Sequence, residues 1–308
     1  MRKVTVIAFF VNTLLYATYY PVAKGALTRL DPWIFMTLAE LLTLPVAIAL
    51  LWRARRLSMQ TVASGIVLGV ISNLAFVAGL QALRFTSATN TTFLGALSGV
   101  LGALIARIVL GQRLHPLTWL AGVLSVIGAA GLIFEGGWAG LNIGDLVALL
   151  AAGVYAWNIF QTDRETTKPG VDTRGLLAVV LLTGAALSVV EGLLFADWAT
   201  TLSRLQPIDL GVLAYVAVVT TVIPYAVTLK LQRHLRPVTV AFIYVIEPLW
   251  AAVFAAIYLG EMLSLLGLAS AGLILAGSLL AVRATLPAGE APTALQQPVE
   301  AEYAMGGD

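Results

Sequence analysis

Cysteine is absent from the chain of 308 residues, histidine occurs only twice, and charged side chains make up 11% of the residues. A chain without cysteine has no disulfide, no thiol nucleophile and no zinc–thiolate site. The net charge of +2 is too small for the basic surface that binds nucleic acid. His115 and His234 stand at expected helix ends, without an HExxH, Gly-x-Ser-x-Gly or Walker pattern. We therefore predict no enzyme, no metal ion or other cofactor, and no nucleic-acid partner.

Apolar residues are what the sequence has in excess. They make up 59% of the chain, and the mean hydropathy is +0.92. A bilayer core of about 30 Å is crossed by about 20 apolar residues in a helix. Ten segments qualify: Val4–Val22, Trp33–Leu51, Thr61–Gln81, Ala88–Leu110, Leu117–Phe134, Gly144–Gln161, Leu176–Phe195, Leu210–Leu229, Val238–Leu259 and Leu263–Val282. We predict an all-α polytopic membrane protein with ten transmembrane helices in a lipid bilayer.

The distribution of Lys and Arg orients this arrangement, because cytoplasmic loops collect both residues. Of the 18 Lys and Arg residues, 13 fall on one side, and Arg107 lies within a span. The four on the other side are Lys24, Arg29, Arg84 and Arg204. Both termini are therefore expected to be cytoplasmic. Residues 287–308 are rich in Pro, Ala, Glu and Gln without apolar periodicity, which predicts a disordered tail.

The chain is similar to itself at two offsets. An offset of 149 residues aligns Leu110-Gly111-Gln112 with Leu259-Gly260-Glu261, and Gly128 with Gly277. An offset of 139 residues aligns Tyr16-Ala17 with Tyr155-Ala156. We expect two five-helix halves, residues 1–137 and 138–286, around a central cavity. Because five is odd, the second half would be inverted in the membrane, an arrangement typical of secondary transporters that bind substrate near the midplane.

The segments that close each half carry a family resemblance. Glu247-Pro248 is followed by Gly260-Glu261, while the first half has Gly99 and Gln112 at the matching positions. Over about residues 5–285 the chain resembles EamA-type ten-helix exporters of the drug/metabolite transporter superfamily. Its Tyr- and Trp-rich inner faces are most similar to the YddG-type exporters of aromatic and other neutral amino acids. The resemblance implies a bacterial inner-membrane exporter that does not hydrolyse ATP.

Polar side chains inside the first spans are candidates for binding. Asn12, Tyr16, Tyr19 and Tyr20 share one helical face, and we assign Tyr16 and Tyr19 to the cavity, with tyrosines of an interfacial belt as the alternative reading. Asn73 and Asn90 are amides in apolar surroundings. Interhelical hydrogen bonding is the alternative role for them.

Later spans offer a second set. Trp157, Asn158 and Gln161 combine an aromatic plane with two amides, which can hold an amino acid. A carboxylate within a span is costly, so Glu247 either faces a cavity, pairs with a cation or is protonated. Tyr244 lies one turn before it and Trp250 three residues after it. Pro45 and Pro224 predict helix kinks, and Glu40, Glu191 and Arg107 are assigned structural roles.

These observations favour a secondary transporter that exports neutral or aromatic amino acids and related small metabolites by alternating access. A monomer suffices for this function. The predicted substrate-binding residues are Tyr16, Tyr19, Asn73, Asn90, Trp157, Asn158, Gln161, Tyr244, Glu247 and Trp250. A proton-coupled multidrug or organic-cation exporter that uses Glu247, and a channel, stay open as alternatives.

Overall fold

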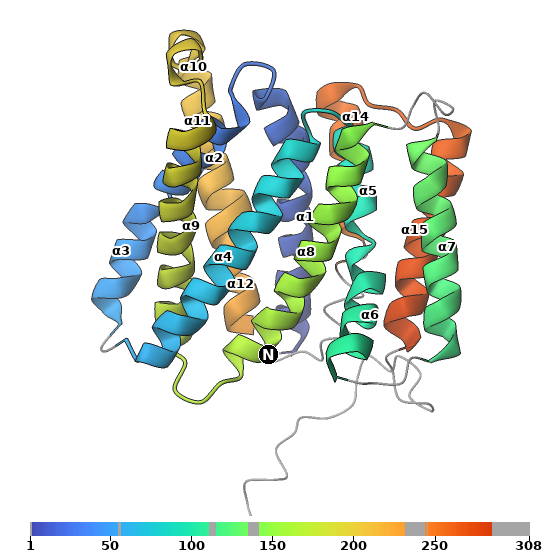
Figure 1. Cartoon of the computed structure of the whole chain (residues 1–308), viewed down its shortest axis with the longest axis horizontal. Helices are drawn as coiled ribbons and strands as arrows, with labels where there is room; N and C mark the ends of the chain where they lie inside the picture. Colours follow the sequence, from blue (N-terminus) through green and yellow to red (C-terminus); the bar gives the residue numbers. More distant parts are fainter. Residues whose placement is uncertain are drawn as a thin grey trace, which may run out of the picture.

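The computed structural model describes residues 2–54, 57–110, 115–134, 142–231, 244 and 246–284, and all regular elements in these ranges are helices (Figure 1). The first part of the chain forms α1 (Arg2–Ala26), α2 (Pro32–Leu41), α3 (Leu44–Arg53), α4 (Met59–Ala82), α5 (Ala88–Gly95), α6 (Ser98–Leu110) and α7 (Pro116–Ile133). The second part forms α8 (Ile143–Thr166), α9 (Thr173–Phe195), α10 (Trp198–Arg204), α11 (Pro207–Tyr215), the π-helix η2 (Val216–Val222), α12 (Ile223–Leu231), α14 (Glu247–Leu259) and α15 (Leu265–Ala284).

Eight helical stretches in the described ranges are long and apolar enough to cross a membrane. They are Thr5–Ala26, Pro32–Arg53, Met59–Ala82, Ala88–Val109, Pro116–Ile133, Ile143–Thr166, Thr173–Phe195 and Pro207–Leu231. Glu247–Leu259 and Leu265–Ala281 are shorter apolar helices. The prediction of a multi-pass all-α membrane protein is therefore confirmed. The count of ten stays a prediction, because part of the expected ninth span falls outside the described residues, as does the expected tail 287–308.

The first helices of the two halves run in opposite directions. The Nζ of Lys24, in the last turn of α1, donates to the carbonyl oxygen of Thr86 at 2.8 Å. The hydroxyl of Thr86 donates to Oδ1 of Asp145, in the first turn of α8, at 2.5 Å. Helix α1 thus ends at the face of the bundle where α8 begins (Figure 1). We call this face the Lys24 end and the opposite one the Glu165 end.

Close packing between α7 and α15 follows the 149-residue offset. A Cβ atom at Gly128 would lie 2.5 Å from the carbonyl oxygen of Ser270 on α15. A Cβ atom at Gly277 would lie 2.7 Å from the carbonyl oxygen of Ala121 on α7. Gly128 and Gly277 are 149 positions apart, and so are Ala121 and Ser270. The two glycines therefore make equivalent contacts, each allowing the other half's helix to approach.

Helix interruptions fall inside several spans. The expected break near Pro45 is present, since α2 ends at Leu41 and α3 begins at Leu44. The π-helical turn η2 comes directly before Pro224, where the missing N–H of proline disturbs the α-helical ladder. The fourth span, expected as one helix, is divided between α5 and α6. Ser98, the first residue of α6, and Glu247, the first residue of α14, are again 149 positions apart.

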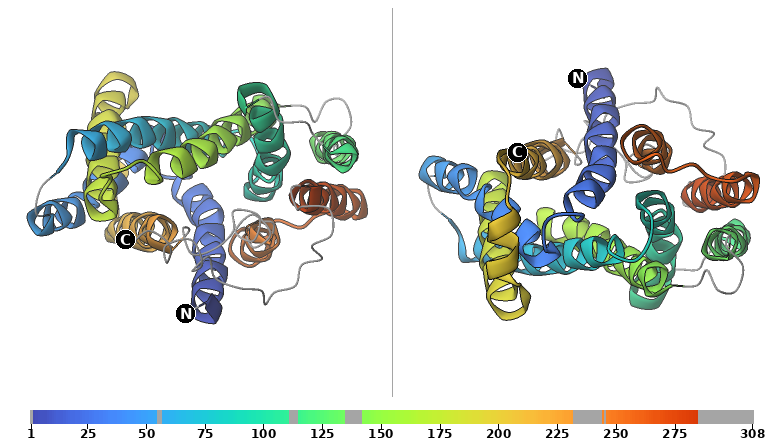
Figure 2. Two further views of the ribbon diagram at one scale, coloured as in Figure 1. Left: turned by 90° about the horizontal axis from the view of Figure 1, so that it is seen from below. Right: turned by 90° about the horizontal axis from the view of Figure 1, so that it is seen from above.

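The two halves meet along α4 and around α1. Seen from the ends of the bundle, α4 and α8 run side by side, and α1 lies between α12 and α14 (Figure 2). Helix α4 also packs against α9 through two glycines. A Cβ at Gly65 would lie 2.5 Å from Cβ of Val179, and one at Gly69 would lie 2.6 Å from Cβ of Thr183. This α4–α9 seam admits no side chain larger than hydrogen at either position.

Candidate functional site

A group of polar and aromatic side chains lies where α1, α8, α12 and the start of α14 converge. Its best-connected member is Asn12, whose Nδ2 donates to the hydroxyl of Tyr244 at 3.0 Å and to Oγ1 of Thr228 at 3.4 Å. The hydroxyls of Thr228 and Tyr244 are 3.2 Å apart. Asn12 is 1% exposed, and its Oδ1 has no hydrogen-bond partner among the described residues. A buried acceptor is thus left open.

Tyr16 and Tyr155, which the 139-residue offset aligns, belong to the same group. The rings of Tyr16 and Tyr244 have centroids 6.2 Å apart and are tilted by 51°. Tyr155 lies within electrostatic range of Tyr16, Tyr225 and Glu247, and its side chain is 38% exposed. We define the central cluster as Asn12, Tyr16, Tyr155, Tyr225, Thr228, Tyr244 and Glu247. Asn12 and Tyr155 each lie near the middle of their helix, which is where transporters of repeated architecture bind substrate.

Glu247 provides the formal charge of the cluster. It is the first residue of α14 and is half-buried, and its carboxyl group has no hydrogen bond or ion pair within the described ranges. Its nearest electrostatic partners are tyrosines, among them Tyr16, Tyr20 and Tyr155. A carboxylate in this setting can accept a cationic group or a proton.

Asn158 connects the central cluster to a small cavity. Its Nδ2 donates to Oγ of Ser72 at 2.8 Å, and Ser72 hydrogen-bonds the hydroxyl of Tyr225. Ser72 and Tyr225 line a cavity of about 20 Å³ between α2, α4, α9, η2 and α12. Its walls are formed by Glu40, Gly69, Ser72, Asn73, Phe76, Val180, Leu181, Gly184, Thr221 and Tyr225, and we call it the Glu40 cavity.

Two of the predicted substrate-binding residues lie on the side of this cavity. The Nδ2 of Asn73 donates to Oε2 of Glu191 at 3.3 Å. The ring of Tyr19 packs edge-on against Phe76 at 5.9 Å between centroids, and Tyr19 is within electrostatic range of Glu40. Tyr16, Tyr244 and Glu247 therefore share the central cluster, whereas Tyr19 and Asn73 border the neighbouring space.

Four predicted residues make no hydrogen bond or ring contact with the central cluster in the described ranges. Trp157 packs on Phe160 with centroids 5.4 Å apart, and Trp250 packs edge-on against Phe10 at 6.2 Å. Gln161 has a buried Oε1 without a partner. Asn90 donates from its backbone N–H to the capping Oγ of Ser87 at 2.9 Å. Their binding roles stay predictions.

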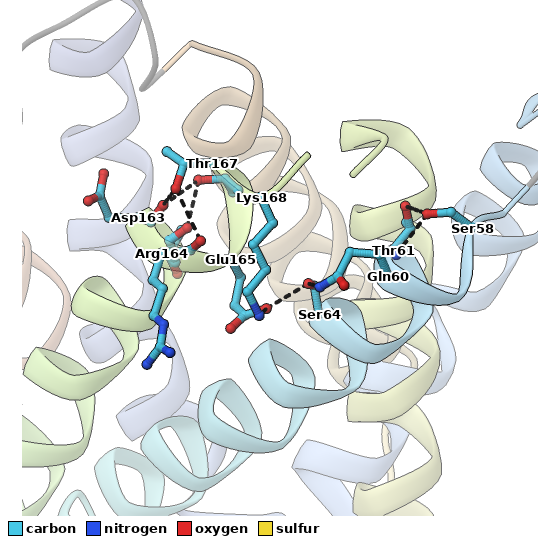
Figure 3. A network of polar contacts seen from close by, with 11 residues as sticks. Ser58, Gln60, Thr61, Ser64, Asp163, Arg164, Glu165, Thr167 and Lys168 are labelled. Carbon is cyan, nitrogen blue, oxygen red and sulfur yellow. Dashed lines mark hydrogen bonds and ion pairs between the residues drawn. The ribbon is translucent and has the colours of Figure 1, made fainter. Parts of the chain in front are cut away.

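Polar contacts join the helices at the Glu165 end. Oε2 of Glu165 accepts from Oγ of Ser64 at 2.6 Å and from Nζ of Lys168 at 2.5 Å. Oγ of Ser58 donates to the carbonyl oxygen of Gly170 at 2.9 Å. Figure 3 shows Ser58 and Ser64 at the start of α4 and Glu165 and Lys168 at the end of α8. They tie the first half of the chain to the second on this face.

The Lys24 end is hollowed by a wide cleft of about 460 Å³. The four Lys and Arg residues counted on this side in the sequence, Lys24, Arg29, Arg84 and Arg204, all line it, together with Asp31 and Asp197. Arg29 is committed to Asp209, with its Nη2 2.5 Å from Oδ1. The basic residues of this face are thus gathered around one opening.

The similarity of the chain to known proteins agrees with this architecture. The EamA-like transporter family matches residues 3–134 and again residues 142–283. The chain belongs to the EamA-like transporter family. Members of this family are membrane transporters of small molecules and not enzymes, and the chain is accordingly a multi-pass membrane transporter. No curated protein matches the chain.

A solved crystal structure of another protein has the same fold. It aligns with a TM-score of 0.63 and 18% identity over 91% of this chain and 98% of the other.

In the present chain, the Gly260-Glu261 motif has a structural explanation. Gly260 ends α14 with φ of 68°, a conformation that favours glycine. Oε1 and Oε2 of Glu261 accept from the backbone N–H groups of Ala88 and Thr89, both at 3.0 Å, capping α5.

Sequence reasoning missed several members of the two sites. Tyr155 was paired with Tyr16 by the 139-residue offset but was not named as a binding residue, although the pairing itself was the signal. The only sequence signal near Tyr225 is Pro224, directly before it. Ser72 and Thr228 carry no sequence signal of their own, because small hydroxyl residues are common in membrane helices.

Proposed function

We propose that this chain is a secondary transporter that exports neutral or aromatic amino acids and related small metabolites across the bacterial inner membrane by alternating access. The proposal includes ten spans in two inverted halves, residues 1–137 and 138–286, with both termini cytoplasmic. One copy of the chain suffices, since a single chain supplies the whole central cluster. The opposite directions of α1 and α8 and the equivalent contacts of Gly128 and Gly277 support the inverted arrangement.

The observation that carries the substrate proposal is Glu247, a carboxylate among tyrosines without a cationic partner in the described ranges. An amino acid supplies the missing cation as its ammonium group. The unpaired Oδ1 of Asn12 is a second acceptor for that group. The rings of Tyr16 and Tyr244 offer an apolar, polarisable wall for an aromatic or aliphatic side chain.

The carboxylate of the amino acid needs donors, and the tyrosine hydroxyls are the nearest ones. Tyr155 lies within electrostatic range of Glu247, so its hydroxyl can donate to a carboxylate whose ammonium group contacts Glu247. This combination of aromatic rings and one carboxylate supports a YddG-type specificity. A multidrug or organic-cation exporter would use the same Glu247 without needing the donors, and a channel would need neither.

Counterflow in proteoliposomes tests the proposal. Vesicles holding the full chain are preloaded with unlabelled phenylalanine, methionine or threonine and given the radiolabelled form outside, beside empty vesicles. A carrier exchanges the two pools, so uptake is accelerated by internal substrate. Uptake without trans-stimulation would identify a channel, and no uptake of the three amino acids would overturn the amino-acid proposal.

Competition by substrate analogues distinguishes an amino-acid exporter from an organic-cation exporter. Phenethylamine keeps the ammonium and the ring but lacks the carboxylate, and phenylpropionate lacks the ammonium. We expect both to compete at least about tenfold more weakly than phenylalanine, because each loses a hydrogen bond to a charged group, of about 1.5–3 kcal/mol. Equal competition by phenethylamine and phenylalanine would favour the organic-cation exporter.

A further inference from the structure

The Glu40 cavity contains a second carboxylate site that the proposed substrate does not use. Glu40 is 8% exposed, and its carboxyl group has no hydrogen bond or ion pair among the described residues, although its backbone carbonyl accepts from Thr43. Glu191, from α9, is close enough to interact with it electrostatically. Helix α2 thus places the carboxyl group of Glu40 on the cavity wall, and α9 places that of Glu191 on Asn73 of the same wall.

An unsatisfied amide lies at the same place. Asn73 is 2% exposed, lines the cavity and donates from Nδ2 to Glu191 at 3.3 Å. Its Oδ1 is fully buried and has no hydrogen-bond partner in the described part of the chain. A buried acceptor without a partner destabilises the folded protein. A donor is therefore missing from this site, and a carboxyl O–H is such a donor.

The titratable groups around Glu40 and Glu191 do not neutralise the negative charge of these two carboxyl groups. Tyr19 from α1 and Tyr225 from α12 are the other titratable groups within electrostatic range of Glu40. No Lys, Arg or His is among the described residues that line the cavity. Arg29, on the α1–α2 connection, is already paired with Asp209 of α11. Two adjacent carboxylates without a cation are costly in a membrane interior, unless they bind a positive ion.

The size of the space selects the ion. A volume of about 20 Å³ holds on the order of one water molecule, whereas pockets for organic ligands measure about 300–1,000 Å³. A hydrated metal ion does not fit beside the carboxyl groups. We propose that the Glu40 cavity is a proton-binding site in which Glu40 and Glu191 hold one proton, oriented by Asn73.

Binding is a simple proton transfer. A proton from water forms one O–H bond with a carboxylate oxygen of the pair and leaves by the reverse step. Asn73 then donates from Nδ2 to the ionised partner and accepts at Oδ1 from the protonated one. Glu191 is half-buried and stands one turn before the end of α9 at Phe195, so protons reach the pair from the Lys24 end.

A short polar path links the proton site to the central cluster. Tyr225 lines the cavity and hydrogen-bonds Ser72, which accepts from Asn158 at 2.8 Å. Tyr225 is also within electrostatic range of Tyr16. Protonation of the pair therefore changes the charge seen by the substrate site. This coupling rests on the proposed function, whereas proton binding itself does not.

Carbodiimide labelling of the full chain in proteoliposomes tests proton binding without any substrate. Dicyclohexylcarbodiimide reacts with protonated carboxyl groups in apolar surroundings, and mass spectrometry locates the modified residue. We expect labelling at Glu40 or Glu191 that falls at least about tenfold as the pH is raised from acidic to alkaline, the change that follows from one titrating proton. Sodium chloride at constant pH should leave it unchanged.

Variants make the result specific. Glu40→Gln and Glu191→Gln should each remove the pH-dependent labelling of the pair, whereas Asp163→Asn, which removes an exposed carboxylate on α8, should not. Absence of labelling at both positions in the wild-type chain would overturn the proposal. Protection by sodium at constant pH would also overturn it, in favour of a sodium site. Failure of amino-acid counterflow would leave the labelling unaffected, so the two proposals fail separately.

Discussion

The central cluster and the Glu40 cavity both present a carboxylate that lacks a cationic partner in the described ranges, yet their surroundings differ. Glu247 stands among tyrosines, one of which, Tyr155, is 38% exposed. Glu40 is enclosed between helices around about 20 Å³ of space. The same residue type is therefore suited to an organic ammonium group in one place and to a proton in the other. The two carboxylates differ in burial, since Glu247 is half-buried whereas Glu40 is 8% exposed.

Two glycines lie on the wall of the Glu40 cavity. Gly69 and Gly184 face the Glu40 cavity, and Gly69 lets α4 approach α9 until a Cβ would lie 2.6 Å from Thr183. Around Asn12, by contrast, the contacts are made by large side chains, with the rings of Tyr16 and Tyr244 6.2 Å apart between centroids. Variants that remove charge from the central cluster or add volume at the Glu40 cavity test this difference between the two sites.

Loss of charge at the central cluster should have the largest effect. Glu247→Gln keeps the shape but removes the partner of the substrate ammonium group, at a cost of about 1.5–3 kcal/mol. We expect the dissociation constant of phenylalanine, measured by calorimetry on the purified protein, to rise about 10- to 150-fold. Asp163→Asn, an equal loss of charge at an exposed position, is the control. Unchanged affinity in Glu247→Gln would remove Glu247 from the binding site.

A methyl group in the α4–α9 seam should destabilise the bundle. Gly69→Ala places a Cβ 2.6 Å from Cβ of Thr183, and overpacking of this kind costs about 1–3 kcal/mol. The midpoint of thermal unfolding in detergent should fall. Gly79→Ala on the same helix has no atom within 4 Å of its new Cβ and should raise the midpoint slightly, as alanine favours helix. Equal midpoints for the two variants would contradict the packing described for the seam.

Removal of one hydroxyl from the central cluster should have a smaller effect. Tyr244→Phe leaves the ring beside Tyr16 but removes the hydrogen bonds to Asn12 and Thr228. Such bonds in membrane proteins contribute about 1 kcal/mol or less. The half-saturating concentration of phenylalanine in counterflow should rise by no more than about fivefold. A loss as large as that of Glu247→Gln would assign the hydroxyl a direct contact with substrate.

Crowding of Glu40 should produce the smallest change in transport. A Cβ at Gly184 would lie 3.2 Å from Oε2 of Glu40, so Gly184→Ala displaces the carboxyl group by a few tenths of an ångström. We expect the pH dependence of carbodiimide labelling to shift, while counterflow at fixed pH stays within about twofold of wild type. A loss of counterflow in Gly184→Ala well beyond this range would show that the Glu40 cavity forms part of the substrate site.

Hydropathy and self-similarity predicted much of the fold. The apolar segments became the long helices, and the alignment of Gly128 with Gly277 identified two glycines with equivalent contacts. The break between α5 and α6 was not predicted, because Gly99 stands where proline would have marked it. The equivalent helix start at Glu247 does carry a proline, Pro248.

The candidate sites were harder to predict. Tyr16 and Tyr155, which the 139-residue offset aligns, both belong to the central cluster. Glu40 and Glu191, which are 151 positions apart, were assigned separate structural roles, since only the packing of α2 on α9 brings their carboxyl groups within electrostatic range. Charge in a span is visible in the sequence, whereas its neighbours across the bundle are not.

The central claim is that Glu247 and Glu40 bind different ligands. The most direct test is phenylalanine counterflow at one fixed pH, measured side by side for the wild type, Glu247→Gln and Glu40→Gln. The account predicts exchange by the wild type, at least tenfold weaker exchange by Glu247→Gln, and exchange by Glu40→Gln within about twofold of wild type, because exchange of substrate for substrate needs no net proton movement. Equal loss in both variants would contradict it.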